Sequence, residues 1–264
     1  MTNPWQDLPL FAAKTYDSPS VFEPANLLRE ARRQLNLPNV AVPAVTLLDP
    51  DGDIVRYLES SGRAQRHPGW ACYHSEMWTI DLGGIEVGVV GKAVGAPFAV
   101  MVAEQLSASG ADLVISITSA GQISPIDDVP CFVLINQALR DEGTSAHYVS
   151  PSRWSHLDPA IAARLTGVFD NFEQPVMTGP SWTTDAPYRE TAEAISAAEA
   201  AAITCVEMEA AALYAYAAAR HRDVVCFAHI TNTMAVDGDD FDKGDHNGVH
   251  EALAIVRATA LALR

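Results

Sequence analysis

The prediction of the fold starts from the stretch Val206-Glu207-Met208-Glu209-Ala210-Ala211-Ala212-Leu213-Tyr214-Ala215-Tyr216. The apolar run 201–206 predicts a buried strand, and the alanine-rich run after Glu209 predicts a helix. Open α/β sheets place ligand-binding groups at such strand-to-helix junctions. Two carboxylates at this position are costly to bury unless they bind something. A helix can also begin with Glu simply to complement its own dipole, and the spacing alone leaves both interpretations open.

Composition narrows the class of protein. The chain has 264 residues, of which 48% are hydrophobic and 19% are charged, which suits an α/β domain with a sizeable core. Its formal net charge of −16 excludes binding of nucleic acid or an anionic membrane over a broad surface. A small anion held by a few local cations remains compatible with this charge.

Cysteine usage and the terminal sequence predict a cytoplasmic protein. The four cysteines form no CxxC pair and three of them lie in strongly apolar runs, which predicts reduced, buried thiols. No Cys/His spacing is typical of a zinc site, so we expect no metal. Residues 1–17 lack the pattern of a signal peptide. No apolar run of about 18 residues free of charge is present, so no membrane span is expected.

Predicted strands and helices alternate along the chain, which favours a single α/β domain around a mostly parallel or mixed sheet. Residues 1–40 are expected to form an N-terminal arm and helix, and residues 41–264 the α/β domain. The predicted helices are 25–35, 98–109, 159–172, 190–201 and 248–263. The predicted strands are 44–48, 78–82, 85–90, 111–117, 131–135, 176–179, 201–206 and 224–232.

Three strands end in polar residues that predict ligand-binding corners. The first strand runs into a Gly-containing turn, 49–56, that ends in an arginine and suits an anion. The second corner is 118–122, and the third is the polar end of the strand 224–232. The stretch 181–191 carries aromatic and charged side chains that could cover a flat ring and contact its edge. The acidic run 237–246 lacks the order of a calcium loop and is predicted to be solvated.

Several of these blocks together resemble the nucleoside phosphorylase and nucleosidase superfamily, in the order that the family has. The matching residues are Gly52-Asp53-Ile54-Val55-Arg56, Gly95-Ala96-Pro97, Ser119-Ala120-Gly121, Arg140-Asp141-Glu142-Gly143-Thr144-Ser145, Thr184-Asp185 and Glu207-Met208-Glu209. The last block is the most specific. The resemblance implies an α/β domain with a central, partly barrel-like mixed sheet, and cleavage of a ribosyl N-glycosidic bond.

The resemblance also implies roles for individual residues. Glu209 and Arg56 would be catalytic. Glu209, Met208 and Glu207 would bind ribose, where a carboxylate can accept from two hydroxyls and favour a cationic transition state. Phosphate would be held by Gly52, Arg56, Ser119, Ala120 and Gly121, and the candidate base contacts are Tyr188, Arg189, Asn232 and Trp182. The implied partners are a nucleoside, inorganic phosphate as co-substrate without a further cofactor, and further copies of the chain in a dimer or a ring of dimers.

Departures from the family pattern concern the phosphate and the base. Ser116 stands where uridine phosphorylases have an arginine, and His74-Ser75-Glu76 lacks the arginine of a His-Arg-Glu block. Lys92, Arg63 and Arg66 are the candidate replacements. Asn232 stands near an aspartate of the purine branch and cannot donate a proton as an acid would. The segment 185–189 is shorter than its uracil-reading counterpart, so the base stays open.

Arg56 favours phosphorolysis, because the nucleosidase branch has a glutamate at the matching position. Ser119-Ala120-Gly121 resembles the nucleosidase version of its corner, so a hydrolytic nucleosidase remains the alternative. A non-catalytic nucleoside or base binder is a third interpretation, against which the intact Glu207-Met208-Glu209 block weighs. A dinucleotide-dependent dehydrogenase is not expected, because the segment 91–97 lacks the glycine fingerprint.

Overall fold

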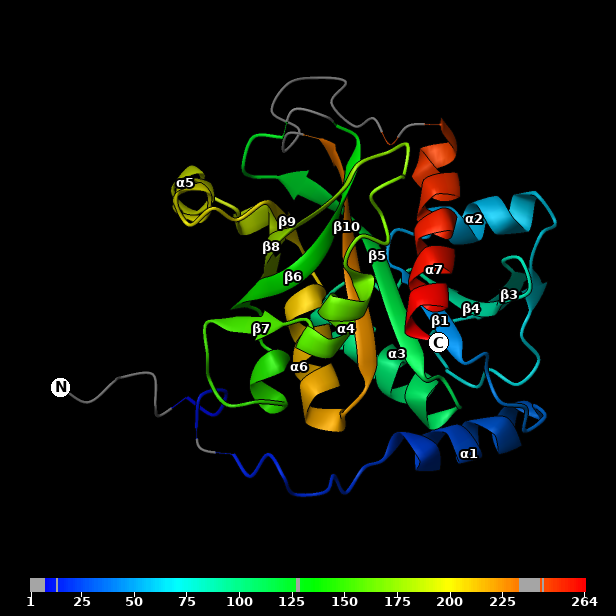
Figure 1. Cartoon of the computed structure of the whole chain (residues 1–264). Helices are drawn as coiled ribbons and strands as arrows, with labels where there is room; N and C mark the ends of the chain where they lie inside the picture. The colour runs from blue at the N-terminus through cyan, green and yellow to red at the C-terminus, as the bar shows by residue number, and fades with distance from the viewer. Residues whose placement is uncertain (1–7, 13, 127–128, 233–242, 244) are drawn as a thin grey trace.

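The computed structural model describes residues 8–12, 14–126, 129–232, 243 and 245–264 (Figure 1). The helices in this part of the chain are α1 (Pro24–Leu35), α2 (Asp53–Ser60), α3 (Ala96–Ala108), α4 (Pro159–Leu165), α5 (Ala192–Ala200), α6 (Ala210–Arg220) and α7 (Val249–Leu263). The strands are β1 (Val45–Asp49), β2 (Gln65–Arg66), β3 (Trp78–Asp81), β4 (Glu86–Gly91), β5 (Leu113–Gln122), β6 (Cys131–Asp141), β7 (Trp154–His156), β8 (Val176–Thr184), β9 (Cys205–Glu207) and β10 (Asp223–Asn232).

Strand β5 is the centre of the sheet. Its first half pairs with β1 in parallel, and almost its whole length pairs with β10 in parallel. Its last residues, Gly121 and Gln122, pair with β9 in antiparallel orientation. The order β5-β10-β6-β8-β9 returns to β5, so these five strands close into a barrel, while β1, β4, β3 and β2 extend from β5 as an open wing. The partly barrel-like mixed sheet that the resemblance implied is thereby confirmed.

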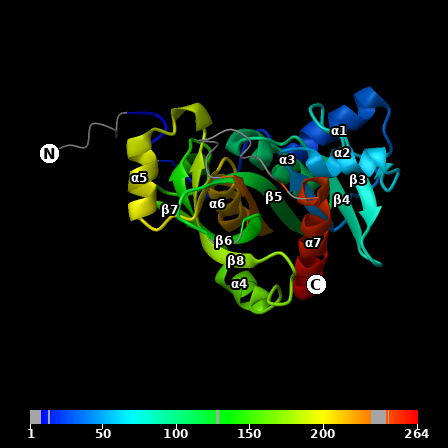
Figure 2. The same ribbon diagram turned by 90° about the horizontal axis from the view of Figure 1, so that it is seen from above.

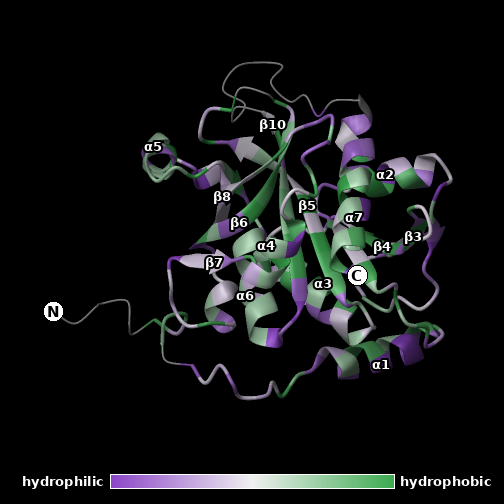
Figure 3. Cartoon of the chain, viewed as in Figure 1, coloured by the Kyte–Doolittle hydropathy of each residue, from purple (hydrophilic) through white to green (hydrophobic). Residues whose placement is uncertain are grey.

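The hydrophobic core lies between this sheet and the helices that cover it. Every residue of β1 is buried, and the largest fully buried side chains include Tyr214, Tyr216, Phe132 and Phe227. Tyr214 fixes α6 to the barrel, because its hydroxyl donates to the carbonyl of Ile135 and accepts from the Cys226 amide. Figure 3 shows the apolar strands at the centre of the molecule, and Figure 2 shows α7 and α5 on opposite sides of it. All four cysteines are free and buried, as predicted.

Three strands are longer than the sequence pattern predicted. The residues 118–122, 138–141 and 180–184 were expected in corners or loops but continue β5, β6 and β8. Closure of the barrel explains the difference, because it gives polar segments a partner: Arg140 pairs with Thr183, and Asp141 with Thr184. Helix α4 ends at Leu165 rather than at residue 172, since the left-handed Gly167, with a φ of +76°, follows closely.

The termini of the described chain complete the fold. Helix α1 buries Leu28 and Ala31 in a small cluster with Ala71 and packs near α3 (Figure 1). Most of the acidic run 237–246 lies outside the described residues, so its predicted character stays a prediction. None of the described helices is both long enough and apolar enough to cross a membrane.

Candidate active site

The two carboxylates of the opening stretch have different surroundings. Glu207, the last residue of β9, is 3% exposed and accepts four hydrogen bonds. Its Oε1 accepts from the hydroxyls of Ser181 (2.9 Å) and Thr183 (2.5 Å), and its Oε2 accepts from the amides of Glu209 and Ala210, both at 2.7 Å. A carboxylate has about four acceptor positions, so those of Glu207 are filled. Glu207 therefore fastens the start of α6 to β8, and the ribose-binding role predicted for it does not fit this geometry.

Glu209 precedes the first residue of α6 and is only 2% exposed. Its Oε1 accepts from the Gly95 amide at 2.7 Å, just before α3 begins. Its Oε2 is buried and accepts no hydrogen bond of standard geometry from the described residues, although the Thr118 hydroxyl lies close enough to the carboxylate to lower its pKa. Burial, and secondarily the charge of Glu207, raises the pKa of Glu209 to about 8. A buried carboxylate with one free oxygen is the kind of group that ligand hydroxyls satisfy. Met208 beside it is half-buried.

The first predicted corner begins where β1 ends. Asp49 is buried, and its carboxylate accepts from the amides of Gly52 (3.1 Å) and Val55 (2.9 Å). Burial, and secondarily the neighbouring Asp51 and Asp53, raises the pKa of Asp49 to about 7. Gly52 has a φ of +73°, in the left-handed region that favours glycine. These contacts fold the turn tightly and start α2 at the next residue.

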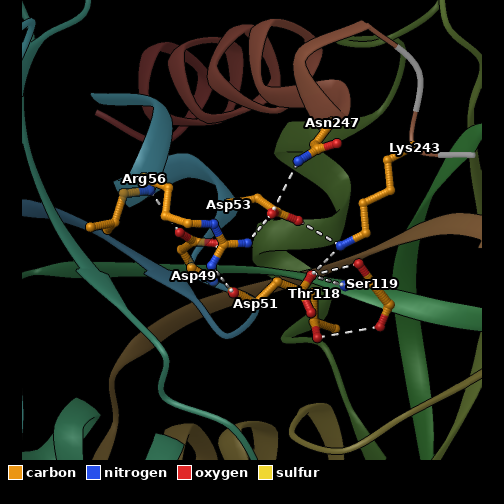
Figure 4. Close-up of polar contacts among 10 residues, drawn as sticks. Asp49, Asp51, Asp53, Arg56, Thr118, Ser119, Lys243 and Asn247 are labelled. Atoms are coloured by element: carbon orange, nitrogen blue, oxygen red, sulfur yellow. Dashed lines mark hydrogen bonds and ion pairs between the residues drawn. The ribbon is translucent and has the colours of Figure 1, made fainter. Parts of the chain in front are cut away.

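Arg56 lies in the first turns of α2 rather than in a loop, and its side chain is 55% exposed. Its guanidinium contacts the carboxylate of Asp53 and donates to the carbonyl of Asp51 at 3.2 Å (Figure 4). Asp53 also accepts from Lys243 Nζ at 2.6 Å and from Asn247. Burial would raise the pKa of Asp53, but the bonds from Lys243 and Arg56 outweigh it and hold that pKa below its usual range.

Lys243 is a cation at this corner that the sequence did not single out. It belongs to a segment that was interpreted as a solvated acidic loop, and the sequence carries no signal for its position. Among the candidate replacement cations, Lys92 lies beside Gly52, where a Cβ on the glycine would come within 3.0 Å of Lys92 Cγ. Arg66 instead pairs with Glu76 at 2.6 Å, and Arg63 lies 6.0 Å from the ring centroid of Tyr57.

The second corner meets the first through Asp51. Ser119 donates its amide (2.8 Å) and its hydroxyl (2.5 Å) to Asp51 Oδ2 (Figure 4). Ala120 and Gly121 lie within β5, opposite Ile230 and Asn232 of β10. The structure therefore brings Gly52, Arg56 and Ser119 together at one edge of the sheet. The side chain of Asn232 lies outside the described part of the chain.

His229 lies on β10, opposite Ser119 in the parallel ladder. It is 5% exposed and stacks on Phe132 with ring centroids 4.3 Å apart. Burial, followed by the charge of Lys243, lowers its pKa to about 4, so the ring is neutral at pH 7. Gly248 packs against it, since a Cβ there would come within 2.3 Å of His229 Cε1. His229 thus packs between Phe132 and Gly248, while its Nε2 has no hydrogen-bond partner among the described residues.

The predicted base contacts are dispersed. Trp182 is 6% exposed and packs in a separate hydrophobic cluster with Ile203 and Val206, while its indole N–H donates to Asp141 Oδ2 at 3.0 Å. Side chains alternate along β8, so Trp182 points to the opposite side from Ser181 and Thr183, which bind Glu207. Tyr188 is 99% exposed, and the neighbouring Arg189 is exposed as well. Their base-binding roles stay predictions.

Comparison with known proteins identifies the family. The family model of the phosphorylase superfamily matches residues 44–264, and the chain belongs to this superfamily of enzymes. It resembles the guanosine phosphorylase of Halorubrum lacusprofundi, with 27% identity over 134 residues, 51% of this chain and 56% of that protein. It also resembles the uridine phosphorylase of Thermococcus kodakarensis, with 31% identity over 109 residues, 37% of this chain and 39% of that protein. The chain thus matches between about two fifths and three fifths of the length of these relatives.

Solved structures agree on the fold. The uridine phosphorylase of Vibrio fischeri superposes with a TM-score of 0.69 and 19% identity, covering 84% of this chain and 91% of that one. The purine nucleoside phosphorylase of Toxoplasma gondii, in complex with immucillin-H, superposes with a TM-score of 0.71 and 15% identity, covering 86% and 93%. At these identities the likeness establishes the closed mixed sheet flanked by helices. Among the described residues, no group of three or more His, Cys, Asp or Glu side chains is placed to hold a metal ion.

Proposed function

We propose that the chain cleaves the N-glycosidic bond of a ribonucleoside or deoxyribonucleoside by phosphorolysis. A phosphate oxygen forms a bond to the anomeric carbon of the sugar, and the bond from that carbon to the base breaks. The electron pair leaves with the base nitrogen, which gains the proton that the attacking hydrogen phosphate loses. The products are the free base and the sugar 1-phosphate. No further cofactor takes part in this scheme.

The observation that carries the proposal is the geometry of Glu209. Its Oε1 is fixed by the Gly95 amide at 2.7 Å, and its Oε2 is buried without a hydrogen-bond partner among the described residues. A carboxylate of this kind can accept from the vicinal hydroxyls of a sugar. Once ionised, it also stabilises the positive charge that develops on the sugar as the bond to the base breaks. A protein that only binds nucleosides has no need of that charge.

The nucleophile half of the site rests on the corner around Gly52. Arg56 and Lys243 contact Asp53, and Lys92 lies beside Gly52. Arg56, Lys243 and Lys92 can donate to a phosphate dianion beside the carboxylates of Asp51 and Asp53, with which Lys243 pairs. They support phosphorolysis over hydrolysis, in agreement with the names of the relatives.

A nucleoside panel tests the proposal. The purified protein is incubated with purine and pyrimidine nucleosides, with and without inorganic phosphate, and both the base and the sugar product are identified. We expect base release that depends on phosphate and yields sugar 1-phosphate. Release that ignores phosphate and yields free ribose would establish the hydrolytic nucleosidase instead. Tight binding of a base without turnover would establish the non-catalytic binder. Arg56→Ala should raise the KM for phosphate more than the KM for the nucleoside.

The base, the assembly and the cellular location remain predictions. The panel decides between purine and pyrimidine, for which Tyr188, Arg189 and Asn232 are the candidate contacts. We expect a homo-oligomer, a dimer or a ring of dimers, which light scattering of the purified protein measures. A cytoplasmic location is expected on the grounds of cysteine usage and is open to cell fractionation.

A further inference from the structure

The aspartate-rich turn carries a carboxylate that the proposed reaction does not use. Asp51 points from the turn after β1 to β5, where its Oδ2 accepts both the amide and the hydroxyl of Ser119, at 2.8 and 2.5 Å (Figure 4). The side chain is 33% exposed, so it lies at the surface of the site rather than in the core. Asp51 thus holds the two donors that one oxygen of an anion would otherwise take.

Ser119 is among the residues assigned to phosphate at the second corner. An amide and a hydroxyl converging on one point form a compact anion site, and each bond to a charged acceptor is stronger than a neutral one. A phosphate dianion and the Asp51 carboxylate cannot both accept from the same hydrogen atoms. Their like charges also repel each other at this distance. Binding of phosphate at Ser119 therefore requires the Asp51 carboxylate to leave.

A second cation makes this exchange feasible. Lys243 Nζ lies 3.6 Å from Asp51 Oδ2, while it is bonded to Asp53 at 2.6 Å. When the Asp51 carboxylate leaves Ser119, the ammonium group is near enough to pair with it. The partly exposed carboxylate then keeps a charged partner. Arg56, bonded to the backbone carbonyl of Asp51, remains on the other side of the turn.

We propose that Asp51 determines the specificity of this site for its anionic co-substrate, by competing with phosphate for the two Ser119 donors. The inference rests on the proposed phosphorolysis and deepens it. Asp51 sets how much phosphate the enzyme needs. The competing carboxylate also disfavours anions that are smaller or less charged than phosphate, because such anions form weaker hydrogen bonds with the two Ser119 donors.

Three variants test the competition. Asp51→Asn keeps the size of the side chain and removes its charge, and Asp51→Ala removes the competing acceptor altogether. Asp112→Asn is the matched control, because it removes the same charge from an exposed residue just before the same strand, roughly 20 Å from Ser119 at about 3.3 Å per residue. The KM for phosphate, the KM for the nucleoside and kcat are measured for each protein. The dissociation constant of inorganic phosphate is measured separately by calorimetry, and thermal unfolding checks that each variant is folded.

We expect both Asp51 variants to bind phosphate about tenfold more tightly, the factor that follows from losing one competing charged hydrogen bond. The KM for phosphate should fall accordingly while the KM for the nucleoside stays within about twofold, and Asp112→Asn should match the wild type. Unchanged or weaker phosphate binding by a folded Asp51→Asn overturns the proposal. The proposal is also overturned if the wild type releases base without phosphate and the Asp51 variants do not. That result would make Asp51 a base that activates water.

Calorimetry separates this inference from the proposed function. If no nucleoside is cleaved but Asp51→Asn binds phosphate more tightly than the wild type, the proposed function falls and the competition stands. If phosphorolysis occurs and the phosphate constants are equal in all variants, the proposed function stands and the competition falls. If none of the proteins binds phosphate, the competition is wrong.

Discussion

The substitution Glu209→Gln should make the protein more stable above neutral pH while removing most of its activity. Glutamine has nearly the same shape, so its carbonyl oxygen can still accept from the Gly95 amide at the position of Oε1. The amide group takes the position of Oε2, which is buried without a partner among the described residues. The substitution therefore removes a buried charge and leaves the packing in place.

The magnitude follows from the pKa of Glu209. Burial raises that pKa from 4.5 to about 8, so the folded state binds more protons than the unfolded state between these values. The free energy of unfolding of the wild type therefore falls by up to about 1.4 kcal/mol per pH unit from pH 4.5 upward, and the loss levels off above pH 8. The total reaches about 5 kcal/mol as an upper limit. Glutamine does not titrate, so the variant lacks this loss.

Urea denaturation of both proteins at pH 5 and at pH 8.5 measures the effect. The stability of Glu209→Gln minus that of the wild type should be small at pH 5 and should grow by about 2–5 kcal/mol at pH 8.5. Over the same range kcat/KM of the variant should stay about 100-fold or more below that of the wild type, which is the usual loss for one transition-state contact. A stability difference that does not grow with pH would refute the burial argument. Near-native activity would remove Glu209 from the catalytic site.

The contacts of Glu207, Gly248 and Glu209 support three further predictions. Glu207→Ala leaves two hydroxyls and two amides without their acceptor, so the free energy of unfolding in urea should fall by about 3 kcal/mol or more; a change below about 1 kcal/mol would show that Glu207 does not fasten α6. Gly248→Ala places a methyl group against His229 at a φ of +67°, and thermal unfolding should show a destabilisation of about 2–4 kcal/mol; an unchanged Tm would mean that this contact is absent. Since Glu209 must be ionised to stabilise the sugar cation, kcat/KM of the wild type should rise with pH up to about 8 and then level off. A profile that is flat from pH 6 to 9 would contradict this assignment.

Local pattern was sufficient for the alternation of strands and helices. Helix α1 begins at Pro24 where the sequence predicts a start at residue 25, and the hairpin around Gly83-Gly84 forms as expected. The strand-to-helix junction at Glu207-Met208-Glu209 also follows from local hydrophobicity, although strand β9 begins at Cys205 rather than at residue 201. These features depend on neighbours within a few positions, which is the range over which periodicity and turn residues act.

The ends of the barrel strands and the roles of individual side chains required the tertiary structure. Residues 138–141 of β6 and 180–184 of β8 are polar and become strand only because closure of the sheet supplies their partners. Trp182 is of a residue type that often contacts rings, but the alternation of side chains along β8 directs it toward a hydrophobic cluster. A sequence window cannot show which face of a strand meets the core when both faces are covered.

The opening stretch shows where this division falls. Local sequence is enough to place two carboxylates on either side of Met208, between a strand and a helix. The folded chain is needed to show that Ser181 and Thr183 of β8 donate to Glu207 and that the Gly95 amide donates to one oxygen of Glu209. The role of a buried charge depends on the donors around it, and these donors come from segments about 25 to 115 positions away.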